Sequence, residues 1–214
     1  MKKILLIEDR VERQNKFTNE TGIALDKYET FLDRRESLDK DSLGEYSTII
    51  THRSAFGESD ENILDYLKKY CEVHQTKLVF FSGGISSTFY SKIKYEFLLL
   101  NSKSFYSKKL ELFLDDFQKN QEPNILLLGY GKDWKTNILL NTLEKINLFI
   151  SNNETKERVK FNKFKTETKI ENIEDMIEFE YPQIGKGNGV FLDDLKALSK
   201  DIKFQIQKEV EFND

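Results

Sequence analysis

Several short apolar runs of the chain end in residues that could bind ions or take part in proton transfer. Glu8 and Asp9 come directly after the run Ile4 to Ile7, where adjacent carboxylates could bind a cation. Three later runs end in polar residues as well, and the complete set of candidate pocket residues is Glu8, Asp9, Thr51, His52, Arg53, Ser82, Gly83, Gly84 and Lys103. We expect them to form one ligand or switch pocket.

The elements that must position these residues are short strands. The run Ile4 to Ile7 is apolar at consecutive positions, which is typical of a strand buried on both faces of a parallel sheet. Similar runs alternate with helical patterns and predict further strands at 28–32, 48–51, 78–81 and 97–100. The sequence thus predicts an α/β fold with a doubly wound, five-stranded parallel sheet of the flavodoxin type. Ligands of such sheets bind at the carboxyl ends of the strands.

Apolar residues at helical spacing predict the helices between and after these strands. In the first half they indicate helices at 10–17, 60–71, 86–94 and 107–119, and in the second half at 134–149, 170–177 and 192–206. Pro123 ends the preceding helical pattern and marks a boundary. We therefore expect an α/β domain over 1–120 and a smaller, mainly helical region over 124–214.

Composition excludes several classes of protein. Charged residues make up 33% of the 214 residues and aromatic residues 13%, which indicates a globular protein with a charged surface. The net charge of -4 gives no general reason to expect nucleic-acid binding. A single cysteine and two histidines exclude an intramolecular disulfide and argue against a metal site rich in these residues. With no apolar run of membrane-spanning length and no signal sequence, we expect a cytoplasmic protein.

Residues 1–120 resemble the receiver domain of bacterial two-component response regulators. Glu8 and Asp9 match the acidic pair of that family, Ser82 matches its hydroxyl position after the fourth strand, and Lys103 matches its lysine after the fifth. The chain departs from the family after the third strand, where Thr51, His52 and Arg53 stand in place of the phosphoacceptor aspartate. The resemblance is therefore to a pseudo-receiver, a receiver-like domain without its acceptor.

The resemblance implies a function in regulation. A receiver uses three carboxylates to hold Mg²⁺, so losing the central one weakens the metal site and removes the nucleophile. The resemblance thus implies Glu8 and Asp9 as the remaining ligands of a weak, vestigial metal site. We expect an ion pair between Lys103 and Asp9 in its place, and no cofactor. The implied protein is a non-catalytic regulator or adaptor that acts through contacts with another protein or with a second copy of itself.

An alternative interpretation assigns a nucleotide or phosphate ligand to the same strand ends. The segment Ser82 to Thr88 resembles the pyrophosphate-binding loop of the ATP pyrophosphatase family, although Ser86 occupies the position of that family's aspartate. The backbone N–H groups of Gly83 and Gly84 could contact a phosphate in such a loop. This interpretation implies an enzyme or a sensor.

A lysine-rich segment at 152–169 belongs to neither interpretation. Within it, a local basic cluster comprises Lys156, Arg158, Lys160, Lys163 and Lys165. They could contact a nucleic-acid backbone. We favour pairing with the acidic residues that follow, or a solvated face, over that contact.

Overall fold

The computed structural model describes residues 3–15, 28–31, 43–53, 55, 61–92, 94–120, 122–168, 170 and 189–211. It divides the chain into two compact units, Met1–Lys132 and Asp133–Asp214, and each is described by itself. The expected domain break at Pro123 lies about ten residues before this division. The intervening helix α6 (Leu126–Tyr130) belongs to the first unit, where it packs against α4 (Ser102–Phe105), α5 (Lys108–Asn120) and β6 (Phe97–Asn101).

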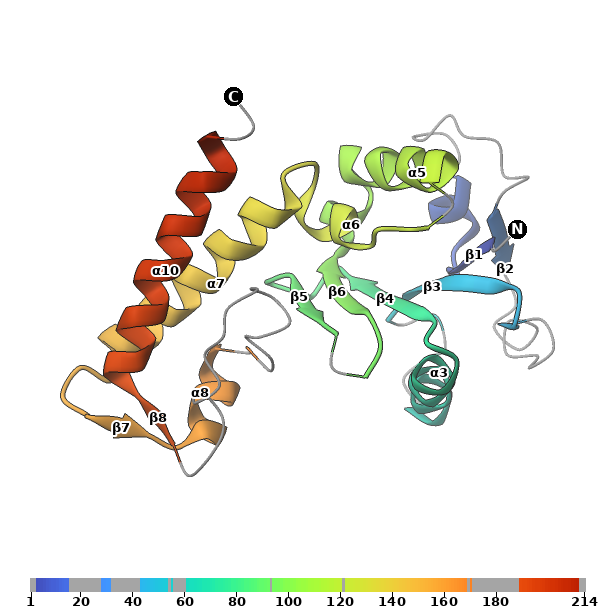
Figure 1. The fold of residues 1–214 in the computed structure, drawn as a ribbon. Helices are drawn as coiled ribbons and strands as arrows, with labels where there is room; N and C mark the ends of the chain where they lie inside the picture. The colour runs from blue at the N-terminus through green and yellow to red at the C-terminus, as the bar shows by residue number, and fades with distance from the viewer. Residues whose placement is uncertain are drawn as a thin grey trace. The chain divides into compact units, whose positions relative to one another are not determined.

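The first unit is built on a six-stranded mixed sheet (Figure 1). Parallel strands run in the order β2-β1-β3-β4-β6, and they comprise β1 (Lys3–Ile7), β2 (Tyr28–Phe31), β3 (Tyr46–His52), β4 (Lys77–Ser82) and β6. A further strand, β5 (Phe89–Ser91), pairs antiparallel with β6 at the edge. The α/β class is confirmed, but the prediction of a purely parallel, five-stranded sheet is wrong.

The error lies between β4 and β6, where the sequence predicts a helix at 86–94. The structure forms β5 there, with Phe89 opposite Leu99 and Ser91 opposite Phe97. Tyr90 is buried, and its hydroxyl donates a hydrogen bond of 2.9 Å to Glu96. Aromatic residues favour strands, and here their cross-strand contacts outweigh a short helical pattern.

Helices cover both faces of the sheet (Figure 1). On one face Leu5, Ile49 and Leu78 form a core with Leu67 and Cys71 of α3 (Glu61–His74). The opposite face packs on α4 and α5, the latter burying Leu110, Phe113, Leu114 and Phe117. The predicted helices at 60–71 and 107–119 are confirmed. Of the predicted helix at 10–17, residues 11–15 are helical, and residues 16 and 17 lie outside the described residues.

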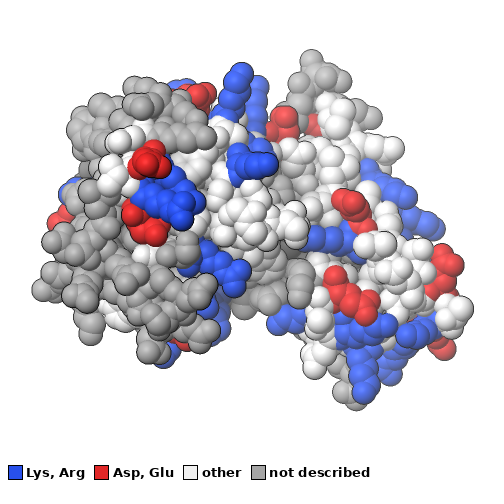
Figure 2. All heavy atoms as spheres, turned by 180° about the vertical axis from the view of Figure 1, so that it is seen from behind, with Lys and Arg blue, Asp and Glu red and all other residues white. Residues whose placement is uncertain are grey.

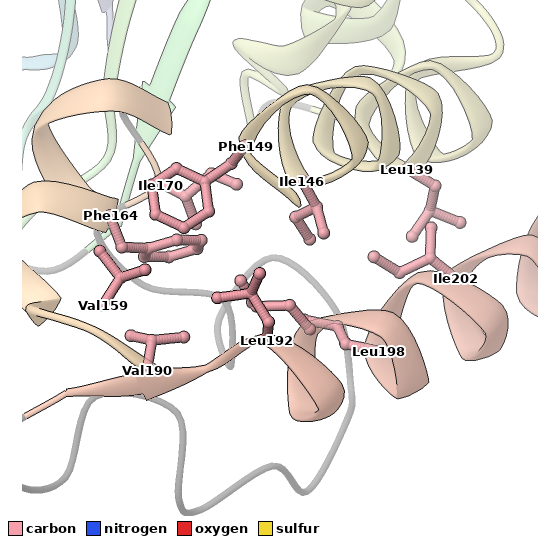
Figure 3. Close-up of a cluster of buried hydrophobic side chains, with 11 residues drawn as sticks. Leu139, Ile146, Phe149, Val159, Phe164, Ile170, Val190, Leu192, Leu198 and Ile202 are labelled. Atoms are coloured by element: carbon pink, nitrogen blue, oxygen red, sulfur yellow. The ribbon is translucent and has the colours of Figure 1, made fainter. Parts of the chain in front are cut away.

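The second unit is mainly helical. Its elements are α7 (Trp134–Ser151), β7 (Arg158–Val159), α8 (Phe161–Thr168), β8 (Val190–Phe191) and α10 (Leu192–Glu211). Ile146 and Phe149 of α7 meet Leu192, Leu198 and Ile202 of α10 in a buried cluster (Figure 3). The predicted helices at 134–149 and 192–206 are confirmed. The prediction at 170–177 lies outside the described residues, apart from Ile170.

Charged side chains of both signs appear on the face shown in Figure 2, as the composition predicts. Among the helices of the described residues, we find none with the length and apolarity that crossing a membrane requires.

Candidate functional site

The candidate site lies where β1 and β3 end side by side. Ile7 pairs with Thr51, so Glu8 and His52 follow at the next level of the sheet. Glu8 is fully buried and His52 is 5% exposed. The His52 ring lies edge-on to Phe81 of β4 at 5.2 Å, and Phe81 stacks on Phe105 of α4 at 4.1 Å. Both polar side chains therefore lie at the margin of the core that packs on α4 and α5.

The Glu8 carboxylate is bound from three sides. The guanidinium of Arg13 lies 3.4 Å from Oε1, and the backbone N–H of Arg10 donates to the same oxygen at 3.3 Å. The hydroxyl of Tyr106 donates to Oε2 at 3.3 Å. Arg13 Nη1 also lies 3.0 Å from His52 Nε2. Arg13 is therefore the cation of this site, and it joins the ends of β1 and β3.

Burial determines the charge of both acid-base groups. It raises the pKa of Glu8 to about 7, with a hydrogen bond to Asp9 acting in the same direction and the charge of Arg13 opposing it. Burial and the charge of Arg13 lower the pKa of His52. Since arginine can only donate, Nε2 of His52 accepts the hydrogen bond, which requires a neutral ring. Near neutral pH the site thus holds a neutral imidazole, a cation and a carboxyl group close to its titration midpoint.

The predicted metal ligands Glu8 and Asp9 lie beside His52 and Arg13. Glu8, Asp9 and His52 each offer one ligand atom, and these atoms lie within 4.8 Å of one another. Magnesium prefers an octahedral set of oxygen ligands, whereas one member of this set is an imidazole nitrogen. The Arg13 guanidinium already contacts both Glu8 and His52. The residues present therefore do not fit a resident magnesium ion, and the expectation of Glu8 and Asp9 as its ligands is not supported by the geometry.

The third strand supplies no acceptor carboxylate in this pocket. Thr51 is buried, and its hydroxyl donates to the backbone oxygen of His52 at 3.3 Å. The side chain of Arg53 is exposed, while its backbone N–H donates to the carbonyl of Phe81 at 2.9 Å. Arg53 thus adds a hydrogen bond between the ends of β3 and β4, whereas the side chain of Thr51 bonds within its own strand.

The expected ion pair between Lys103 and Asp9 is wrong. Both side chains are exposed, and the described part of the chain forms no ion pair between them. The reason is the start of α4, where Asn101 is the N-cap and its Oδ1 accepts from the backbone N–H of Lys103 at 2.8 Å. The short helix leaves Lys103 exposed, and the residue that reaches Glu8 is Tyr106 at its end.

Ser82, Gly83 and Gly84 form an ordered turn at the end of β4. Asn101 Nδ2 donates to the carbonyl oxygens of Gly83 at 3.1 Å and Ile85 at 2.7 Å. Ser82 Oγ accepts from the backbone N–H of Gly84 at 3.5 Å. The turn leads into β5 instead of a helix, so it lacks the helix N-terminus that completes the pyrophosphate loop it resembles in sequence.

Sequence reasoning missed Arg13, Tyr106 and Asn101, three residues that organise these strand ends. Arg13 lies in the polar segment after Asp9, and the turn of helix at residues 11–15 returns its side chain to Glu8. That helical spacing was the available signal. Nothing in the local pattern separates Tyr106 from the other aromatic residues of the chain.

The comparisons with known proteins give no match: no protein-family model, no curated protein and no solved structure matches this chain. The fold and the site define the class of protein at a coarse level only. The chain contains an α/β unit in which the buried carboxyl group of Glu8, at the end of a central strand, is paired with Arg13 of the same unit.

Proposed function

We propose that this chain is a non-catalytic regulatory or adaptor protein built on a pseudo-receiver unit, and that it acts through protein contacts. One observation carries the proposal: the buried strand-end carboxyl group of Glu8 is bound by Arg13 and Tyr106 within the molecule. A site that satisfies its own charge holds one conformation without a ligand. The order of the parallel strands, which is the flavodoxin-type order of receivers, supports the same proposal.

The chemistry at the end of β3 also favours a site without phosphotransfer. Phosphotransfer to a receiver requires a carboxylate nucleophile beside a metal ion. Here Thr51 bonds to the neighbouring backbone, and the imidazole of His52 accepts from Arg13. Both of these side chains, which stand in place of the phosphoacceptor, are buried and hydrogen-bonded within the protein.

The second unit offers apolar surface for contacts. Leu148 on α7 is 62% exposed and Phe204 on α10 is 57% exposed, and Leu140 and Val210 are also exposed. Large apolar side chains in water are typical of protein interaction surfaces when they gather in a patch. We assign the contact role to these two helices.

Treatment with acetyl phosphate and Mg²⁺ tests the first half of the proposal. We expect no phosphorylated protein by intact mass, and a melting temperature that Mg²⁺, acetyl phosphate and ATP leave unchanged. Phosphorylation of Asp9 would contradict the proposal, because the site would then be an active switch. A shift with ATP that disappears in Gly83→Ala would instead support the nucleotide interpretation.

Partner capture with matched variants tests the second half. A protein captured from the native host should bind again when purified, and Phe204→Asp should weaken that binding. Lys196→Gln on the same helix is the control, since Lys196 is exposed and pairs only with its helical neighbour Asp193 among the described residues. Light scattering of the purified chain shows whether the partner is instead a second copy of the chain. The proposal fails if the protein is monomeric and captures nothing that binds again.

A further inference from the structure

The lysine-rich segment contains a corner in which two ammonium groups converge. Lys156 Nζ lies 3.4 Å and Lys163 Nζ 2.8 Å from the same oxygen, Oδ1 of Asn153. Asn153 is 1% exposed, and its Nδ2 donates to the carbonyl of Phe149 at 2.9 Å. This second bond fixes the amide, so its oxygen holds the two lysine side chains together.

Capping of helix α7 does not account for the pair. Cations near a helix C-terminus usually compensate its partial negative charge. In α7 the last carbonyl groups are already bound, because Asn152 N–H donates to Leu148 and Asn153 donates to Ile150 and Phe149. The two lysines bond to the asparagine side chain instead of those carbonyl groups.

Among the described residues, few carboxylates lie at this corner, and the acidic residues expected to pair with the segment, Glu171, Glu174, Asp175 and Glu178, lie outside them. The carboxylate of Glu167 lies 3.4 Å from Lys163 Nζ. Among the described residues, no carboxylate lies within ion-pair distance of Lys156, Arg158 or Lys160. The proximity of Lys163 lowers the pKa of Lys156, as expected for adjacent like charges.

Helix α8 adds to the positive potential. Lys160 directly precedes this eight-residue helix, and Lys163 lies in its first turn, which contains no acidic residue. The backbone N–H groups of Lys163 and Phe164 donate to the carbonyl oxygen of Lys160, so α8 contributes through the partial positive charge of its N-terminus. In Figure 2, Lys and Arg side chains gather at the lower right, at the end of the second unit that holds β7 and α8.

We propose that Lys156 and Lys163, held together by the buried amide of Asn153, bind a phosphate group. Two ammonium groups that share one neutral acceptor can each donate to a phosphate oxygen, and lysine is a common phosphate ligand in proteins. The phosphate belongs either to a small phosphorylated molecule or to a nucleic-acid backbone. This site is independent of the regulatory role proposed for the first unit.

Calorimetric titration of the full chain with pyrophosphate tests the site, and fluorescence anisotropy with a labelled single-stranded oligonucleotide tests the second source. We expect the double variant Lys156→Gln, Lys163→Gln to lose affinity by about tenfold or more. Lys196→Gln should bind like the wild type. Binding of pyrophosphate alone assigns a small phosphorylated molecule. Tighter binding of the oligonucleotide, with strong dependence on salt, assigns a nucleic-acid backbone.

Asn153→Asp provides a second test that keeps both lysines. The new carboxylate, together with Glu167, balances the two ammonium groups, so binding of both probes should be lost; circular dichroism verifies that the variant is folded. The proposal is overturned if the wild-type chain binds neither probe. It is equally overturned if the double lysine variant binds them as tightly as the wild type does.

Discussion

The two units of this protein treat polar clusters in opposite ways. In the first unit, Glu8 is fully buried, and its counter-charge Arg13 contacts it from the helical turn at residues 11–15. In the second, Lys156 and Lys163 lie against the neutral amide of Asn153, and among the described residues Glu167 is the one carboxylate within ion-pair distance of either lysine. The first cluster has its hydrogen-bond partners inside the molecule, and in the second the cations outnumber the carboxylates that pair with them among the described residues.

The difference follows from solvation. A charge without water is stable only when partners inside the protein bond to it, so a buried cluster must be internally complete. Water screens cations at a surface, so an excess of charge can persist there until a ligand provides the balance. Burial and counter-charge together indicate which clusters stabilise the fold and which remain available for binding.

The largest expected effect tests whether the second unit depends on its own core. Phe164 is fully buried and lies edge-on to Phe149 at 5.1 Å, so Phe164→Ala should lower the free energy of unfolding by about 3 to 5 kcal/mol. Trp134, the only tryptophan of the chain, reports this unit by fluorescence during urea unfolding. Phe204→Ala, at an exposed position on α10, should change the stability little. Equal effects of the two variants would contradict the assigned core.

The next prediction uses pH to test the buried carboxyl group. The pKa of Glu8 is raised to about 7, so between pH 4.5 and 7 the folded chain binds more protons at this group than the unfolded chain does. Its contribution to stability is therefore present below pH 4.5 and is lost as the pH rises through 7. Glu8→Gln cannot ionise at this position and does not suffer this loss. We therefore expect its stability relative to the wild type to rise by about 2 to 3 kcal/mol between pH 4.5 and pH 8.

Urea midpoints of both proteins at the two pH values give the comparison. His52 contributes in the opposite direction, since its lowered pKa removes stability as the pH falls below 6.5. Because both proteins carry His52, the difference between them isolates Glu8. A difference that does not change with pH would show that Glu8 titrates normally and is not buried.

Arg13 tests the internal counter-charge. Arg13→Met leaves Glu8 without its cation and should cost about 1 to 3 kcal/mol at pH 8, with a smaller cost at pH 5, where Glu8 is protonated. Lys103→Met is the matched control, because Lys103 is exposed at the same edge of the sheet. Urea unfolding measures both. A greater loss in the lysine variant would restore the ion pair expected from the sequence.

The smallest effects concern glycines. Gly131 has a φ of 80°, so Gly131→Ala should cost about 1 kcal/mol in thermal unfolding. A Cβ atom added at Gly83 meets nothing within 4 Å, and its φ lies outside the left-handed region, so Gly83→Ala should be nearly neutral. A large loss at Gly83 would show that its turn is under conformational constraint.

Much of the fold could be predicted from local patterns. The consecutive apolar residues Ile4 to Ile7 and the stripe on α5 record burial directly, because a buried face requires apolar side chains at a regular spacing. The β5 segment could not be assigned in this way. Its three residues gain their strand conformation by pairing with β6, a partner that follows later in the chain.

The sequence by itself determined the α/β class, the parallel strands and the presence of polar residues at their ends. Tertiary structure decided which of those residues meet: Glu8 with His52, Arg13 and Tyr106, and not Asp9 with Lys103. The physical reason is that strand and helix periodicity depend on neighbouring residues, whereas a hydrogen bond requires both atoms to lie within about 3.5 Å. That distance depends on where α4 begins and on how the chain turns after β1.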